Sequence, residues 1–500
     1  MTSERSASSE SNTGSVAWVV LVAAFGGFLF GFDIAVINGA VQPLQAEFEL
    51  GEFSLGFVVA SALLGAMLGA WAGGPIVDRI GRVRSMQIAA TLFFLSAVLS
   101  GLAFTSVDFV LWRILGGIGV GMASVLAPAY IAEVAPTRMR GRLGSMWQMA
   151  IVLGIFFSAV SNAFLANLAG GAGEEFWLGL DTWRWMLIAE AVPALIYGLL
   201  ALSIPESPRY LVGRGQDEKA RRVLSEVVGI TGAAELDQKI SDIRKTINFE
   251  ARQKLKDLFV SGKLMPIVWV GIGLAVFQQF VGINVIFFYS DTLWQSVGIP
   301  EEQSLLIQII STSVNVLFTV VGIVIVDKVG RRIPLAIGSA GMTVSLGVLV
   351  LAFSQAQVED AADGAVMLPE PWNLIALIAA NVFVAFFAAT WALHVAAAGR
   401  DVPQPHPCGG PGRHRGVQLA GELPHQPVLP EHGRALPGLR LRLLRRGGAA
   451  LPDLRAQVGA GDQGTGAGGH AGGRLPARHP LNRRAPQGRG PATEALIPWV

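Results

Sequence analysis

Charged residues and cysteines are both scarce in this chain of 500 residues. Asp, Glu, Lys and Arg make up only 15% of it and hydrophobic residues 52%, whereas about a quarter of a soluble domain is charged. So low a charge over such a length indicates a membrane protein. The single cysteine, Cys408, excludes an internal disulfide framework and a cysteine-rich metal site.

The sequence also lacks the patterns that mark enzymes. It contains no phosphate loop, no metal-ligand cluster and no nucleophile triad, so we expect neither an enzyme nor a bound metal or cofactor. It has no evident cleavable signal peptide either. Residues 1–16 are polar and rich in serine, and we expect a short disordered cytoplasmic segment there.

Ten apolar stretches are long enough to span a bilayer, which takes about 20 residues. Six precede a polar, charge-rich segment at 205–263 and four follow it. We therefore expect a six-helix bundle over 17–204, a cytoplasmic linker with short helices over 205–263, and further helices over 264–393. The stretches lie near 17–39, 54–77, 85–105, 109–132, 143–166, 184–204, 265–289, 304–326, 333–354 and 373–393.

The loops predict the orientation of these helices. The connections near 40–53, 163–182, 290–303 and 355–372 contain no Lys or Arg, whereas the alternate ones and the central segment are basic. Because basic loops stay in the cytoplasm, we expect a multi-pass protein of the cell (inner) membrane with a cytoplasmic N-terminus.

A short motif occurs twice. Asp78-Arg79-Ile-Gly81-Arg82 follows the second stretch, and Asp327-Lys328-Val-Gly330-Arg331 follows the eighth. The same acid-base-x-Gly-Arg pattern at matching positions of two halves indicates an internal duplication, a plan known among transporters with a binding site near the membrane midplane.

Several motifs in order along the chain resemble the sugar porter family of the major facilitator superfamily. The resemblance runs from about residue 17 to 391 and implies an all-α polytopic membrane protein with the major facilitator fold. Its motifs are Gly26-Gly27-Phe-Leu-Phe-Gly31-Phe-Asp33, the two repeated motifs above, Arg113-Ile-Leu-Gly116-Gly117, Pro128-Ala-Tyr130-Ile-Ala-Glu133, Arg140-Gly141, Pro205-Glu206-Ser207-Pro208-Arg209 and Gln278-Gln279-Phe-Val-Gly282-Ile-Asn284.

Asp33 and Arg113 each lie inside an apolar stretch. A charge there is expensive unless it is paired, so it indicates function by default. The resemblance implies that these two residues form a proton-coupling pair. The alternative is a static ion pair that orients helices, although buried pairs are poor stabilisers.

Uncharged amides within the spans suit a sugar, because they supply hydrogen-bond donors and acceptors without net charge. The alternative for each is an interhelical hydrogen bond. Two aromatic residues, which ordinary packing also explains, could supply apolar faces for a sugar ring. The resemblance implies a sugar site that comprises Gln148, Gln278, Gln279 and Asn284, with Asn315, Phe25 and Trp391 as further candidates.

Charged residues in the basic loops resemble a gating network that closes the cytoplasmic side. Simple positive-inside topology explains the arginines but not the acids beside them. The expected members are Asp78, Arg82, Glu133, Arg140, Glu206, Arg209, Asp327 and Arg331.

The character of the sequence changes after Trp391. Residues 394–490 are rich in Gly, Pro, Arg and His and contain no apolar run near 20 residues, so we expect an aberrant, disordered tail over 394–500. The C-terminal bundle over 264–393 would then be truncated to about four helices. If the codons for residues 394–400 are read one base later, they can encode MWLLLGE. In the same shifted reading frame, the codons for residues 456–469 can encode RKWVPETKGQELED. Both resemble family sequence, and we infer a single-base frameshift near 391–392.

These observations favour a secondary transporter that imports a pentose or hexose by proton symport. The alternatives are a facilitator without proton coupling, an inactive frameshifted product, and a sugar sensor, which would require a structured cytoplasmic domain. The expected partners are a monosaccharide, the proton and the lipid bilayer, with no nucleic acid, and we expect a monomer.

Overall fold

Helices form almost all of the chain that the computed structural model describes, which comprises residues 2–136, 139–250, 259–260, 263–264, 266–329, 332–358 and 366–391. The sequence after residue 391, including the expected aberrant tail, lies outside the described residues.

The first half is a helical bundle. Its elements are α1 (Thr2–Val36), the short turn η1 (Ile37–Ala40), α2 (Val41–Glu47), α3 (Glu52–Ile80), α4 (Arg82–Gly101), α5 (Ser106–Val134), α6 (Arg140–Ala169), α7 (Thr182–Ala189) and α8 (Ala191–Ala201). Between α6 and α7, strands β1 (Glu175–Trp177) and β2 (Leu180–Asp181) pair antiparallel.

Three short helices follow, and then the second half. The short ones are α9 (Pro208–Gly213), α10 (Asp217–Glu226) and α11 (Ala233–Glu250). The second half comprises α12 (Pro266–Phe280), α13 (Ile283–Phe288), α14 (Ser290–Gln295), α15 (Glu301–Val329), α16 (Arg332–Phe353), α17 (Trp372–Phe386) and a last turn, η3 (Phe387–Trp391). Two small antiparallel hairpins join β3 (Phe259–Val260) to β4 (Lys263–Leu264) and β5 (Gln357–Val358) to β6 (Val366–Met367).

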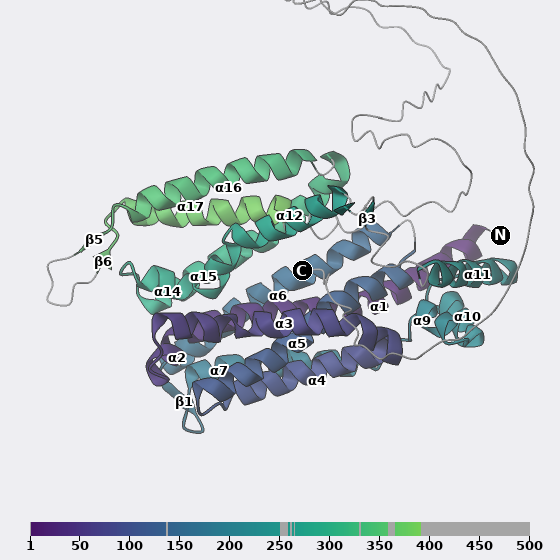
Figure 1. Ribbon diagram of the computed structural model, residues 1–500, viewed down its shortest axis with the longest axis horizontal. Helices are drawn as coiled ribbons and strands as arrows, with labels where there is room; N and C mark the ends of the chain where they lie inside the picture. Colours follow the sequence, from purple (N-terminus) through teal and green to yellow (C-terminus); the bar gives the residue numbers. More distant parts are fainter. Residues whose placement is uncertain are drawn as a thin grey trace, which may run out of the picture. The chain divides into compact units, whose positions relative to one another are not determined.

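Ten helical segments in the described chain are long and apolar enough to cross a membrane, which confirms the ten expected spans. One expectation differs from the structure: α1 already begins at Thr2, within the segment expected to be disordered. A helix once nucleated extends at little further cost, and the polar residues 2–13 contain no proline to end it. Helices α9 to α11 lie at one end of the first bundle, called the α9 end, and β1 lies at the other, called the β1 end (Figure 1).

Glycines allow the helices of the first half to approach closely. A Cβ on Gly65 of α3 would collide with the carbonyl oxygen of Ile114 on α5, and one on Gly117 would collide with that of Ala62. Gly31 of α1 and Gly154 of α6 make the same kind of contact. Such backbone contact gives helices packing energy in lipid, where the hydrophobic effect between them is weak.

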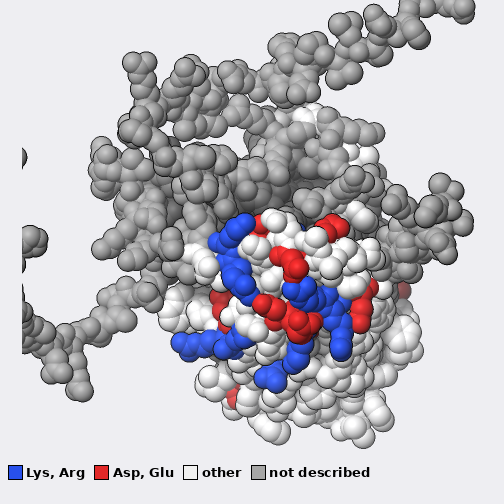
Figure 2. Space-filling view, turned by 90° about the vertical axis from the view of Figure 1, so that its right-hand side faces the viewer, with Lys and Arg blue, Asp and Glu red and all other residues white. Residues whose placement is uncertain are grey.

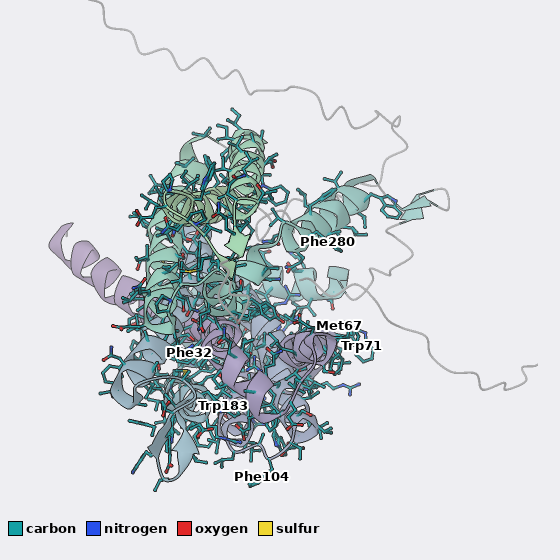
Figure 3. All side chains as sticks on the ribbon, turned by 90° about the vertical axis from the view of Figure 1, so that its left-hand side faces the viewer. Phe32, Met67, Trp71, Phe104, Trp183 and Phe280 are labelled. Carbon is teal, nitrogen blue, oxygen red and sulfur yellow. The ribbon has the colours of Figure 1, made fainter. Side chains whose placement is uncertain are left out.

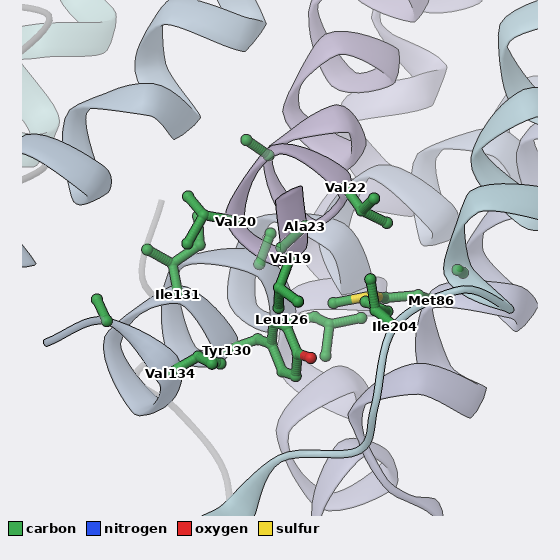
Figure 4. Packing of buried hydrophobic residues seen from close by; sticks show 14 of the residues in the cluster. Val19, Val20, Val22, Ala23, Met86, Leu126, Tyr130, Ile131, Val134 and Ile204 are labelled. Carbon is green, nitrogen blue, oxygen red and sulfur yellow. The ribbon is translucent and has the colours of Figure 1, made fainter. Parts of the chain in front are cut away.

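Apolar side chains fill the interior and also cover the outside of the helices. Val20 of α1 and Leu126 and Ile131 of α5 are fully buried in a core that also includes Met86 of α4 and Ile204 (Figure 4). On the outside, Met67 and Trp71 of α3 are 51% and 50% exposed, and Phe280 is 83% exposed (Figure 3). Exposed apolar faces on this scale mark contact with lipid or with another protein.

Candidate functional site

A buried ion pair joins α1 to α5. Arg113 donates from Nη1 to Asp33 Oδ1 over 2.7 Å and from Nη2 to the backbone oxygen of Asp33 over 3.2 Å. Asp33 is 1% exposed and Arg113 is 2% exposed. The two intramembrane charges that were expected to pair are therefore direct partners in the structure.

A second acid, Glu190, belongs to the same cluster, although it was not among the residues expected there. It is 2% exposed and occupies the break between α7 and α8, where its carboxyl lies within hydrogen-bonding reach of Asp33. Asp33 Oδ2 and Glu190 Oε1 have no hydrogen-bond partner among the described residues. The signal was present, because Glu190 is the only acid between residues 182 and 204.

One pair of expected sugar ligands meets in the structure. Asn284 donates from Nδ2 to Gln279 Oε1 over 2.9 Å. Gly282, with φ of 91°, breaks the helix between them, because glycine adopts this left-handed conformation without strain. The break brings two amides from successive helices, α12 and α13, to one place.

The other expected sugar ligands are spread over several helices. Asn315 of α15 is 3% exposed, Gln148 of α6 and Gln278 of α12 are half-buried, and Trp391 donates from its indole N–H to Ser339 over 3.1 Å. Within the described chain these four side chains form no hydrogen bonds with one another.

Phe25 lies in an aromatic cluster of the first half. Its ring stacks on Phe28 at 5.1 Å between centroids and lies 6.3 Å from Tyr197. With Phe28 and Phe157 it lines an apolar hollow of about 410 Å³, to which none of the candidate amides contributes. These aromatic neighbours agree with ordinary packing of Phe25, which was the alternative to a role as an apolar face for a sugar ring.

A charge network at the α9 end centres on Glu133, and we call it the α9 network. Arg82, which is 6% exposed, donates to both carboxylate oxygens of Glu133 over 2.9 and 3.1 Å, and its Nη2 lies 3.3 Å from Asp78. Ser207 also donates to Glu133, and Arg209 lies 3.7 Å from it. Two parallel hydrogen bonds make the Arg82–Glu133 pair the strongest in the network.

Glu206 completes the α9 network through the backbone. It accepts hydrogen bonds from the N–H groups of Arg82 over 2.8 Å and Val83 over 3.2 Å, at the start of α4. A carboxylate at a helix N-terminus satisfies free amides and complements the helix dipole. The side chains of Arg140, Asp327 and Arg331 lie outside what the structure describes. Acidic and basic side chains interleave on this end (Figure 2).

Two hydrogen bonds join the first half to the second near the β1 end, and we call the four residues the latch. The N–H of Asp291 donates to Asn38 Oδ1 over 3.2 Å, and the N–H of Ala172 donates to Glu301 Oε1 over 2.8 Å. Burial raises the pKa of the Asp291 carboxyl above its ordinary value, and repulsion from Glu301 acts in the same direction. Hydrogen bonds that the carboxylate accepts from Ser304 and Gln295 oppose this rise.

Ten candidate spans in two halves, a buried carboxylate–guanidinium cluster and a charge network at one bundle end are the features of a membrane transporter. Family comparison agrees: the model described as "Sugar (and other) transporter" matches residues 19–405. The chain belongs to this family.

Individual relatives agree with this assignment. The chain is 51% identical over 391 residues to a glucose transport protein of Synechocystis, covering 77% of this chain and 82% of that one. It is 38% identical over 407 residues to the D-xylose-proton symporter of Escherichia coli, covering 76% and 78%. Among solved structures it matches the xylose transporter of E. coli in a partially occluded inward-open conformation. The TM-score is 0.64 and the identity 36%, over 76% of this chain and 83% of that one.

Proposed function

We propose that this protein imports a monosaccharide by proton symport, through alternating access of a central site to the two sides of the membrane. The named relatives support the substrate class, since they are described as a glucose transport protein, D-xylose-proton symporters and an arabinose-proton symporter. A pentose or a hexose is therefore the expected substrate.

The cluster of Asp33, Arg113 and Glu190 carries the proposal of proton coupling. Two carboxylates and one guanidinium sum to one negative charge, and one bound proton makes the cluster neutral. Burying a net charge is expensive, so the cluster favours a proton whenever its surroundings are dry. Asp33 Oδ2 and Glu190 Oε1 each lack a hydrogen-bond partner among the described residues, and a proton shared by the two carboxyl groups would provide a hydrogen bond between them.

Binding of this proton would change how the helices pack. Asp33 is on α1, Arg113 on α5 and Glu190 between α7 and α8, so the charge of one cluster acts on three elements of the first half. A proton can shift a conformational equilibrium only if it binds one conformation more tightly. The buried cluster provides this difference, because opening it to water removes the penalty on its net charge.

The sugar would bind to amides that the second half contributes, with Gln148 from the first half. Gln279 and Asn284 already share a hydrogen bond, and a sugar hydroxyl could replace either partner. Gln278, Asn315 and Trp391 are the further proposed ligands. Neutral donors and acceptors suit a neutral polyol, and no charge is required at this site.

The α9 network is proposed as the inward gate, and the α9 end as the cytoplasmic side of the inner membrane. The basic loops support this orientation through the positive-inside rule. Because exposed pairs contribute only about 0–1 kcal/mol each, the largely buried pair of Arg82 and Glu133 would provide most of the gate's energy. Nothing in this arrangement requires a second copy, so we propose a functional monomer.

Uptake by proteoliposomes tests the proposal. Sequencing the gene around codon 391 comes first, because the inferred frameshift predicts an inactive 500-residue product and an active product after removal of one base. With the reading frame restored, an inward pH gradient should drive accumulation of labelled D-xylose or D-glucose. Entry that never exceeds equilibration would favour the facilitator, and robust uptake by the unshifted product would contradict the frameshift.

A further inference from the structure

The face of α15 that turns toward the latch carries a row of polar residues. Ser304, Gln308, Thr312 and Asn315 follow one another at intervals of four, four and three residues, so they share one face of the helix. They are 0%, 2%, 0% and 3% exposed. Ser304 donates a hydrogen bond to the carboxylate of Asp291, which identifies this face as the one beside the latch.

Gln308 lies one turn from Ser304 on this face, and neither its Nε2 nor its Oε1 has a partner among the described residues. Thr312, its neighbour on the same face, is satisfied because it donates to the backbone oxygen of Gln308 over 2.9 Å. A buried amide without partners costs about 1–3 kcal/mol. Such exceptions are rare in folded proteins and call for a ligand, a water or another conformation.

The position of Gln308 relates it to the proposed sugar site. Asn315 lies seven residues further along the same face, a distance of roughly 10 Å at the rise of an α-helix. The row therefore extends from the latch, where the two halves meet, toward a residue proposed to bind sugar. The amide of Gln308 offers hydrogen-bond donors and an acceptor, which two neighbouring hydroxyl groups of a sugar can satisfy together.

We propose that Gln308 is a second sugar-binding position, on the β1 side of Asn315, which the latch covers in this conformation. A monosaccharide entering from the β1 end would pass Gln308 once the Asn38–Asp291 contact opens. This inference rests on the proposed function. It assigns to the buried amide a ligand of the same chemical class as the transported sugar.

Labelling of a single cysteine tests the position. Gln308→Cys is made together with Cys408→Ser, and a small charged thiol reagent is added outside right-side-out membrane vesicles. Labelling should become at least tenfold faster when Asn38→Ala removes the acceptor for Asp291, and D-xylose or D-glucose should slow it at least threefold. In the control Leu306→Cys, neither change should alter the labelling rate, because Leu306 is already 51% exposed.

The controls separate this proposal from the proposed function. The sugar should also protect Gln279→Cys, labelled from the other side in inside-out vesicles. Protection of position 279 without protection of 308 overturns the second site and leaves the transport function intact, whereas protection of neither contradicts both. Protection of 308 that vanishes with Gln279→Ala also overturns the second site, because the sugar then acts from a distance. If the 500-residue product does not accumulate, the cysteine variants at positions 306, 308 and 279 are made in the chain with a restored frame. Codon 408 no longer encodes a cysteine there, and any other cysteine is replaced by serine.

Transport kinetics provide a readout for the amide itself. Gln308→Met has a similar length without polar hydrogen-bonding groups, and it should raise the KM for entry at least threefold while leaving the KM for exit unchanged. Gln308→Asn, which retains the amide, should recover part of this effect. Equal changes of KM in both directions, or no change, would overturn the proposal, and a purely structural role predicts only altered stability.

Discussion

Substitution of Asp33 by Asn separates proton coupling from sugar binding. The Asp33–Arg113 pair, with an Nη1–Oδ1 distance of 2.7 Å, loses its charge attraction, and the cluster no longer needs a proton to become neutral. One unit of pH gradient supplies about 1.4 kcal/mol, which is a tenfold accumulation for one proton per sugar. The parent should approach this ratio and Asp33→Asn should stop at equilibration, while sugar exchange continues.

The same variant has a predictable stability. Removing one partner of a buried pair costs about 3–5 kcal/mol when the remaining charge stays alone. Glu190 lies beside the pair, so it can compensate Arg113, and Asp33→Asn should lose less than this. The double variant Asp33→Asn/Glu190→Gln should lose more than the sum of its single variants, by about 0.5–3 kcal/mol.

The assay is uptake of labelled sugar into proteoliposomes of the frame-restored protein, with thermal unfolding in detergent for stability. Asp242→Asn is a matched control, because its carboxylate is 53% exposed on α11 and lies outside the proposed machinery. Undiminished uphill accumulation by Asp33→Asn would remove this residue from proton coupling. Additive stability losses would show that Glu190 does not compensate Arg113.

Three further predictions concern the sugar site, the α9 network and the latch. Gln279→Ala should weaken sugar binding by at least about 1 kcal/mol, and Gln278→Ala should weaken it by a similar or slightly smaller amount. If calorimetric titration shows that both variants bind sugar with unchanged affinity, neither residue is a ligand. Glu133→Ala should lower stability by about 3 kcal/mol, against at most about 1 kcal/mol for the exposed pair removed by Arg221→Ala; equal shifts in unfolding temperature would refute this. Because burial raises the pKa of Asp291, the folded protein holds that proton more tightly, so stability should fall as pH rises from the ordinary value of 3.8 through the raised pKa. Asp291→Asn should flatten this dependence in unfolding scans between pH 4 and 7, and identical profiles would contradict it.

The sequence was sufficient to predict the ten spans and the contact of one pair of side chains, Asp33 and Arg113. Hydropathy determines the ten helices because a bilayer requires every backbone amide to be paired within the helix. Two charges in apolar stretches, Asp33 and Arg113, could be expected to meet, since neither can remain alone in lipid. The repeated motif also placed Asp78 and Arg82 in a charge cluster at the end of a span.

Other parts of the site depend on distances that no local pattern encodes. Glu190 was recognisable as a lone acid, but its approach to Asp33 depends on the helix break between α7 and α8. The contact between Asn38 and Asp291 joins positions 253 residues apart. Asn38 and Asn162 each have one amide atom without a partner among the described residues, whereas Gln308 has two. This difference is a property of packing and not of spacing.

Sugar-induced proton movement tests the central claim most directly. Proteoliposomes of the frame-restored protein are suspended in a weakly buffered medium without a pH gradient, and D-xylose or D-glucose is added while the external pH is recorded. Proton symport predicts that the medium becomes more alkaline as sugar enters, and that Asp33→Asn abolishes this change. Entry of labelled sugar without any pH change would show that the protein is a facilitator and that its buried charge cluster has no part in coupling.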